Sequence, residues 1–144
     1  MARTIDGRDW MSDRLHGDAP QDGEAQIICL FDDPDAPTSA WSFSGGPQDP
    51  ELAANGFSRA VADYAHVAGA STSTLNHIFT HSGPSGGGTP VQVNAVGVVA
   101  YLNGVTPPGA AGTGILVFAM PEPNPPTLTG TDSLDQTVLI DFGS

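Results

Sequence analysis

The chain contains no lysine. Its basic side chains are four arginines, set against sixteen acidic residues, and the formal net charge is −12. Binding to nucleic acid or to an anionic membrane normally requires clustered Lys or Arg side chains, which displace counterions from the phosphates. A surface with so little positive charge repels both. We therefore expect neither direct nucleic-acid binding nor membrane binding.

Cysteine is nearly absent as well. Cys29 is the only one, so no internal disulfide can form and the fold must be stabilised by packing. It lies in the apolar run 26–31, and no basic residue lies near it in sequence to lower the pKa of its thiol. This context favours a small buried side chain over a reactive nucleophile.

Long apolar runs are missing too. No stretch approaches the roughly 20 residues that a membrane-spanning helix needs. The first residues, MARTIDGRDWM, lack the apolar centre of a signal peptide. We expect a protein that is made in the cytoplasm and is not exported by that route.

Glycine and proline, in contrast, are abundant, with 18 and 13 copies among 144 residues. This share favours short strands joined by turns over helices. The length suits one domain with one continuous core. We predict an all-β protein, with an extended arm over residues 1–24 and a domain over residues 25–144. The expected domain is a β-sandwich or jelly roll of about six to eight antiparallel strands.

The strongest strand pattern is a predicted central hairpin over residues 59–79, with its turn at 67–71. Alternation along the second strand places Leu75, His77 and Phe79 on one face. The predicted pairs across the hairpin are Ala60 with Ile78, Ala62 with Asn76 and Tyr64 with Thr74.

Other strands are expected at 26–31, 40–43, 91–102, 115–120 and 137–142, and one helical turn at 50–54. The second half of 91–102 is apolar on both faces, which is typical of a strand buried between two layers. In 137–142, Val138, Ile140 and Phe142 share one face.

The N-terminal segment combines three of the four arginines with large apolar side chains. Arg and Trp contribute disproportionately to interfaces, so we expect this arm to order against a neighbouring subunit. A loose terminus is the alternative. The candidate interface residues are Arg3, Arg8, Trp10, Met11, Arg14 and Leu15.

Asp32, Asp33 and Asp35 form the densest carboxylate cluster, and calcium prefers several oxygen ligands. The spacing matches no EF-hand loop, which favours a solvated acidic turn, and sequence alone leaves calcium binding open. His77 and His81 would lie about 13 Å apart along a strand, too far to share a metal unless the chain bends.

His16 and His66 are likewise not spaced for a catalytic pair. The glycine-rich stretch 83–88 lacks the lysine and the following helix of a phosphate-binding loop. We predict no catalytic residue, no metal ligand and no cofactor, and we do not expect an enzyme.

The order of several short motifs resembles a widespread class of small tailed-bacteriophage virion proteins. An opening strand runs into an acidic, proline-containing turn, CLFDDPDAPTSA (29–40), and ANGFSR (54–59) follows a loop. The hairpin AVADYAHVAGASTSTLNHIFT (60–80) matches next. GTGILVF (112–118) resembles the class's glycine loop into an apolar strand, and TVLI (137–140) its end. The resemblance spans about residues 26–142, and the glycine- and proline-rich loops 82–89 and 106–112 are longer than the pattern.

This resemblance implies a virion protein, most simply a capsid decoration or cement protein on the outer surface of the head. Its partners would be the major capsid protein and copies of itself, with a trimer as one arrangement. A tail or fibre component is the alternative from the same particle. A host-surface module is another, in which loops 82–89 and 103–114 grip a glycan or protein and Trp41, Tyr64 or Tyr101 stack on it.

Overall fold

The computed structural model of the protein describes residues 24–84, 87–100 and 104–142. These residues contain nine strands and no helix, which confirms the predicted all-β, sandwich-like fold. Three of the strands have only two residues. In chain order the strands are β1 (Ala25–Phe31), β2 (Ala60–Val61), β3 (Asp63–His66), β4 (Thr72–Thr80), β5 (Val91–Gln92), β6 (Ala95–Ala100), β7 (Ile115–Pro121), β8 (Thr127–Leu128) and β9 (Ser133–Asp141).

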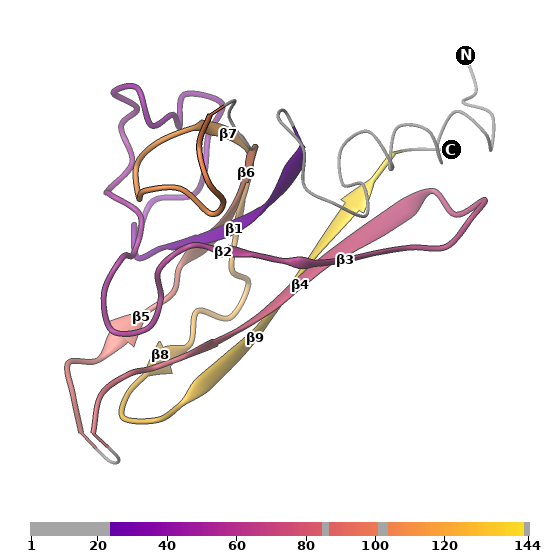
Figure 1. The fold of residues 1–144 in the computed structure, drawn as a ribbon. Helices are drawn as coiled ribbons and strands as arrows, with labels where there is room; N and C mark the ends of the chain where they lie inside the picture. The colour runs from indigo at the N-terminus through magenta and orange to yellow at the C-terminus, as the bar shows by residue number, and fades with distance from the viewer. Residues whose placement is uncertain (1–23, 85–86, 101–103, 143–144) are drawn as a thin grey trace.

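All described strand pairs are antiparallel, and they form three sheets (Figure 1). Sheet A has the order β2-β1-β6-β7, and sheet B has the order β3-β4-β9. Sheet C is the small pair β5-β8. The strands β5 and β8 lead directly into β6 and β9, so sheet C joins the two larger sheets at one end.

The main core lies between sheets A and B. Strand β1 supplies Ile28 and Leu30 to it, and β4 supplies Leu75 and Phe79. The expected alternation on the last strand is confirmed, because Val138, Ile140 and Phe142 all enter this core. Burying such side chains stabilises a fold by about 1.5–3 kcal/mol each, so this core is the principal source of stability.

A second apolar cluster covers the outer face of sheet A. Ile27, Cys29 and Phe31 of β1 pack there with Trp41 and Phe43 of the long segment 32–58. The Phe31 ring packs edge-on against Trp41, with ring centroids 5.2 Å apart. Strands β1 and β6 of sheet A are therefore buried on both faces. This confirms the two-layer prediction for the described part of the second half of 91–102, because every residue of β6 is buried.

The central hairpin is present, but its predicted register was wrong by one residue. Tyr64 pairs with Leu75, and His66 pairs with Ser73. Gly69 adopts a left-handed φ of 84° in the turn closed by the bond from Ala70 N to Val67 O. The connection holds one more residue than predicted. The shift places Tyr64 on the core side of the sheet, where it packs against the main cluster.

The first arm of this hairpin also divides between the two sheets. Ala60 pairs with Ile28 of β1, not with Ile78 as predicted. Asp63 then pairs with Asn76 of β4, so Ala62 has no partner in the hairpin. Its amide instead donates to the Gln26 carbonyl at 2.8 Å. One continuous extended segment, β2–β3, thus crosses from sheet A to sheet B and closes that side of the sandwich.

Three smaller predictions were wrong for related reasons. Residues 40–43 form turns, because Trp41 and Phe43 pack onto sheet A from a loop instead of joining a ladder. Residues 50–54 form no helical turn; the Leu52 amide donates to Leu30 O of β1. The stretch 91–102 breaks between β5 and β6, where the Asn94 amide bonds to Phe31 O.

Candidate docking edge

Strand β7 forms one edge of sheet A. It pairs with β6 on one side, and no described strand pairs with its other side. Its sequence, ILVFAMP, carries no charge. Ile115 is 58% exposed, and Val117 and Phe118 are 37% and 38% exposed. This strand therefore presents apolar side chains and open backbone groups to solvent along the same line.

Folded proteins usually protect such an edge with charged side chains, proline or a bulge. Here Pro121 and Glu122 stand only at the end of the strand. A bulge is present, since Phe118 opposes Val98 while Leu116 opposes Val99, leaving Val117 as the extra residue. The bulge twists the strand locally but adds no charge. An uncharged edge of this kind is a template for a further strand.

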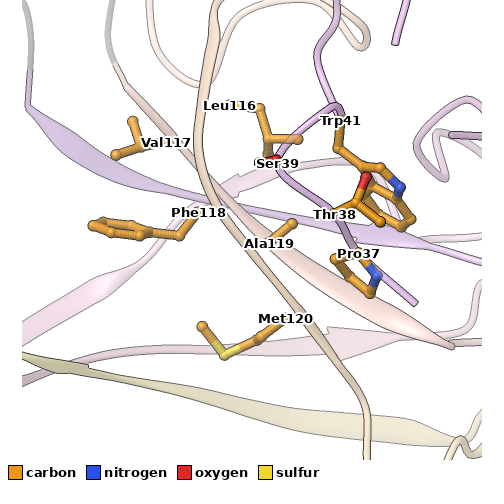
Figure 2. Close-up of a pocket in the computed structure, with 9 residues that line it drawn as sticks. All are labelled: Pro37, Thr38, Ser39, Trp41, Leu116, Val117, Phe118, Ala119 and Met120. Atoms are coloured by element: carbon orange, nitrogen blue, oxygen red, sulfur yellow. The ribbon is translucent and has the colours of Figure 1, made fainter. Parts of the chain in front are cut away.

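A groove of about 540 Å³ runs beside this edge. Pro37, Thr38 and Ser39 form one wall, and β7 forms the other (Figure 2). In this view Leu116 and Ala119 point toward the 37–41 segment, whereas Val117 and Phe118 point away from it. A chain lying along β7 would thus contact side chains on both faces of the strand.

A second hollow, of about 460 Å³, opens where β7 and β9 face each other across the sandwich. Met120 of β7 and Leu134 of β9 line it, together with the acidic residues Glu122 and Asp135. Both strands are the last in their sheets. The side of the sandwich opposite the β2–β3 crossover is therefore open, with apolar and acidic groups at its mouth.

The wall of the groove is held by Asp33. This carboxylate is buried and accepts hydrogen bonds from the amides of Asp35 and Asp49, at 2.8 and 2.6 Å. Asp32 and Asp35 are exposed. Within the described ranges, no three His, Cys, Asp or Glu side chains are grouped to hold a metal ion. The acidic cluster shapes the loop through Asp33.

A buried ion pair, which the sequence analysis did not find, fixes the same segment. The guanidinium of Arg59 donates to both carboxylate oxygens of Glu51, with Nε 2.7 Å from Oε1. It lies 5.0 Å from the Phe43 ring centroid and donates through Nη1 to Thr113 O at 2.9 Å. Arg59 thereby ties the 32–58 segment to the connection before β7. Its isolation as the only arginine after Arg14 was the available signal.

Cys29 lies beside this pair and is fully buried. Burial raises the pKa of its thiol far above the ordinary range, and the Glu51 carboxylate raises it further. The thiol stays protonated and packs as an apolar group, as its sequence context predicted. It is no nucleophile in the folded protein.

The histidines do not converge on one site. His81 is 2% exposed and contacts the Phe57 ring edge-on, while His77 packs against Phe79 on β4. His66 lies at the end of β3, with Nδ1 3.0 Å from Thr72 O. His16 lies outside the described residues. The three described histidines therefore serve separate local contacts.

The candidate interface residues of the arm, Arg3, Arg8, Trp10, Met11, Arg14 and Leu15, all lie outside the described residues. Of the expected stacking rings, Trp41 is buried and Tyr64 packs against the main core. Tyr101 also lies outside the described residues. The apolar run 115–120 predicted this strand, but nothing in it predicted that the outer edge of β7 is open.

No family model, curated protein or solved structure matches the chain. In the part of the chain that the structure describes, no helix has the length and apolarity to cross a membrane.

Proposed function

We propose that this protein is a structural component of a tailed-bacteriophage particle, a decoration protein that binds the outer surface of the head and stabilises contacts between capsid subunits. The observation that carries the proposal is the open apolar edge of β7 with the groove beside it. The motif resemblance described above supplies the kind of particle.

Addition of a strand to an open edge is a common mode of protein association, since the new backbone bonds give affinity and the flanking side chains give selectivity. The β7 edge offers both elements. Ile115, Val117 and Phe118 would lose their exposed apolar area on docking, and the groove would receive side chains of the added strand. Binding only to the assembled state stabilises that state by mass action, which is how a cement protein acts.

Charge supports a place outside the shell. The described residues carry eleven carboxylates and one arginine, and that arginine is paired with Glu51. Such a body is repelled by packaged nucleic acid. The expected stacking rings Trp41 and Tyr64 are committed to packing, so neither supports the alternative of a glycan-binding module.

The test is the copy number of the protein in purified particles, measured by quantitative mass spectrometry against the major capsid protein. A fixed high ratio is expected. A handful of copies per particle would place the protein in the tail or a fibre, and its absence from particles would overturn the proposal.

Rebinding of the purified protein to shells that lack it tests whether β7 is the binding surface. Phe118→Lys should abolish binding, because a buried lysine in an added-strand interface is left unpaired. Ile78→Lys is the matched control, since Ile78 is also exposed, at 58%, but lies on β4 away from this edge. Equal loss in both variants would remove β7 from the binding surface.

A further inference from the structure

We propose that residues 1–24 of one copy add a strand along β7 of a neighbouring copy, so that adjacent copies are linked by exchanged arms. The inference rests on the proposed function only in taking β7 as an assembly surface. It names the occupant of that surface, which is a segment of this same chain.

The shape of the site fits an extended segment. The open side of β7 is seven residues long and straight enough to carry an antiparallel ladder to β6 on its other side, interrupted only at Val117. The Pro37–Ser39 wall stands beside it, so an added strand would have backbone partners in β7 and a side-chain groove in the 37–41 segment. A helix or a globular surface would leave the backbone groups of β7 unpaired.

The segment outside the described residues has the composition to fill this site. Residues 8–16, RDWMSDRLH, hold Trp10, Met11 and Leu15, and 17–24, GDAPQDGE, have the composition of a turn. Fully extended, eight residues span roughly 26 Å. This is more than the roughly 14 Å of three strand spacings, the distance from β1 across β6 and β7 to a strand added beside β7 of the same sheet. A neighbouring β7 that lies within the same reach of Ala25 could be paired by the apolar part of the arm.

The position at which this segment joins the body gives its direction. Ala25 pairs with Ala100, and Ala100 pairs with Ile115, so the start of β1 lies level with the start of β7. Two copies that approach at these ends would exchange arms over a short distance. Each arm would then run antiparallel to the β7 strand that it joins.

Acidic groups of the body lie close to the place where the arginines of an added arm would dock. The described body has a formal charge of −10, from eleven carboxylates and Arg59, so neighbouring bodies repel one another. Arg3, Arg8 and Arg14 are the only other cations of the sequence, apart from histidine. Glu122 follows β7 directly and lines the adjacent hollow with Asp135. Residues 1–23 also hold five aspartates, so the arm has a formal charge of −2 and its arginines can pair only locally with carboxylates such as Glu122.

Disulfide trapping between two variant populations tests the proposal. Trp10→Cys, and separately Met11→Cys to cover the other face of a strand, is mixed with Phe118→Cys and oxidised. Cys29 is buried and should not react, so the unmodified protein provides the background. A cross-linked dimer containing one chain of each variant is expected, several-fold above the yield with Ile78→Cys in place of Phe118→Cys.

Equal yields with Phe118→Cys and Ile78→Cys would overturn the inference. So would a chain carrying both cysteines that forms only an internal disulfide, because the arm would then close its own sheet. If trapping fails while the protein still binds shells and Phe118→Lys abolishes that binding, the proposed function stands without the arm. If trapping succeeds while no particle contains the protein, the arm exchange stands and the function does not.

Discussion

Glu51 and Arg59 are almost completely withdrawn from water, with side-chain exposures of 1% and 3%. Replacing Glu51 by glutamine would leave the guanidinium buried without a counter-charge, which typically costs about 3–5 kcal/mol. We expect Glu51→Gln to lower the free energy of unfolding in urea by that amount. Asp63→Asn, at an exposed carboxylate, is the control and should change it little. A loss below 1 kcal/mol in Glu51→Gln would show that water reaches the pair.

His81 joins three loops through its ring. Nδ1 lies 2.8 Å from Gly130 O and 2.9 Å from Gly83 N, and Nε2 lies 3.0 Å from Thr89 O. A neutral imidazole carries one proton, so it can donate to one of the two carbonyls at a time. The ring is packed closely as well, since a Cβ on Gly83 would meet it at 2.6 Å.

We predict that His81→Phe preserves the packing against Phe57 but loses these bonds. The Gly83 amide then loses its acceptor and one carbonyl loses its donor, and each buried polar group left unpaired costs about 1–3 kcal/mol. Chemical denaturation should therefore show a clear decrease in stability, whereas His77→Phe, on β4 just before His81, should be nearly neutral because His77 is only half-buried. Equal stability of His81→Phe and the unmodified protein would mean that water replaces the imidazole.

At the scale of the element, the contact between β1, β6 and β7 depends on Gly97. A Cβ at this position would lie 2.8 Å from Cys29 Sγ and 2.8 Å from Leu116 Cδ1. We expect Gly97→Ala to destabilise the protein by about 1–3 kcal/mol through overpacking. Gly87→Ala is the control, because its nearest neighbour would be Pro84 Cγ at 3.6 Å. Thermal unfolding of the two variants measures the difference, and equal midpoints would contradict the argument.

The elements also show what the sequence could and could not predict. Strands β1, β4, β7 and β9 were predicted because their alternation or apolar runs depend on local order. The division of 59–66 between two sheets was not predicted, because the local sequence around Ala60 and Asp63 reads as extended strand whichever strand each residue pairs with. The register error arose in the same way: one residue in the turn around Gly69 shifts every pair.

The candidate edge could be predicted only in part. An uncharged strand at 115–120 was expected, but whether a strand is central or at an edge depends on pairing across long sequence separations. The Glu51–Arg59 pair was missed because eight residues separate its members and only the fold around Phe43 brings them together. Arm residues such as Trp10 stay predictions.

For the whole molecule, the lack of lysine leaves few groups that titrate above neutral pH. Burial raises the pKa of Cys29, so in the unfolded chain this thiol ionises first, at its ordinary value of about 8.5. The unfolded state then binds fewer protons than the folded state, and stability falls as pH rises above that value.

We expect the free energy of unfolding to decrease by up to about 1.4 kcal/mol per pH unit between about pH 8.5 and 9.5, below the usual titration of the two tyrosines. Urea titrations across this range measure it. Cys29→Ala should be less stable overall but should lose this slope. The same slope in Cys29→Ala would assign the alkaline loss to another group.

The segment that carries β2 and β3 connects sheets A and B along one side of the sandwich, so the two sheets share a hinge there. Ala62 lies at this hinge: its amide bonds to Gln26 of sheet A, while its neighbour Asp63 pairs into sheet B. The opposite, open side of the sandwich is formed by β7 and β9. Thermal fluctuations should therefore rotate the two sheets about Ala62 and separate them first between β7 and β9. Amide hydrogen exchange should be fastest along β7 and slowest along β1. A strand added to the β7 edge should hold the two sheets together and slow that exchange.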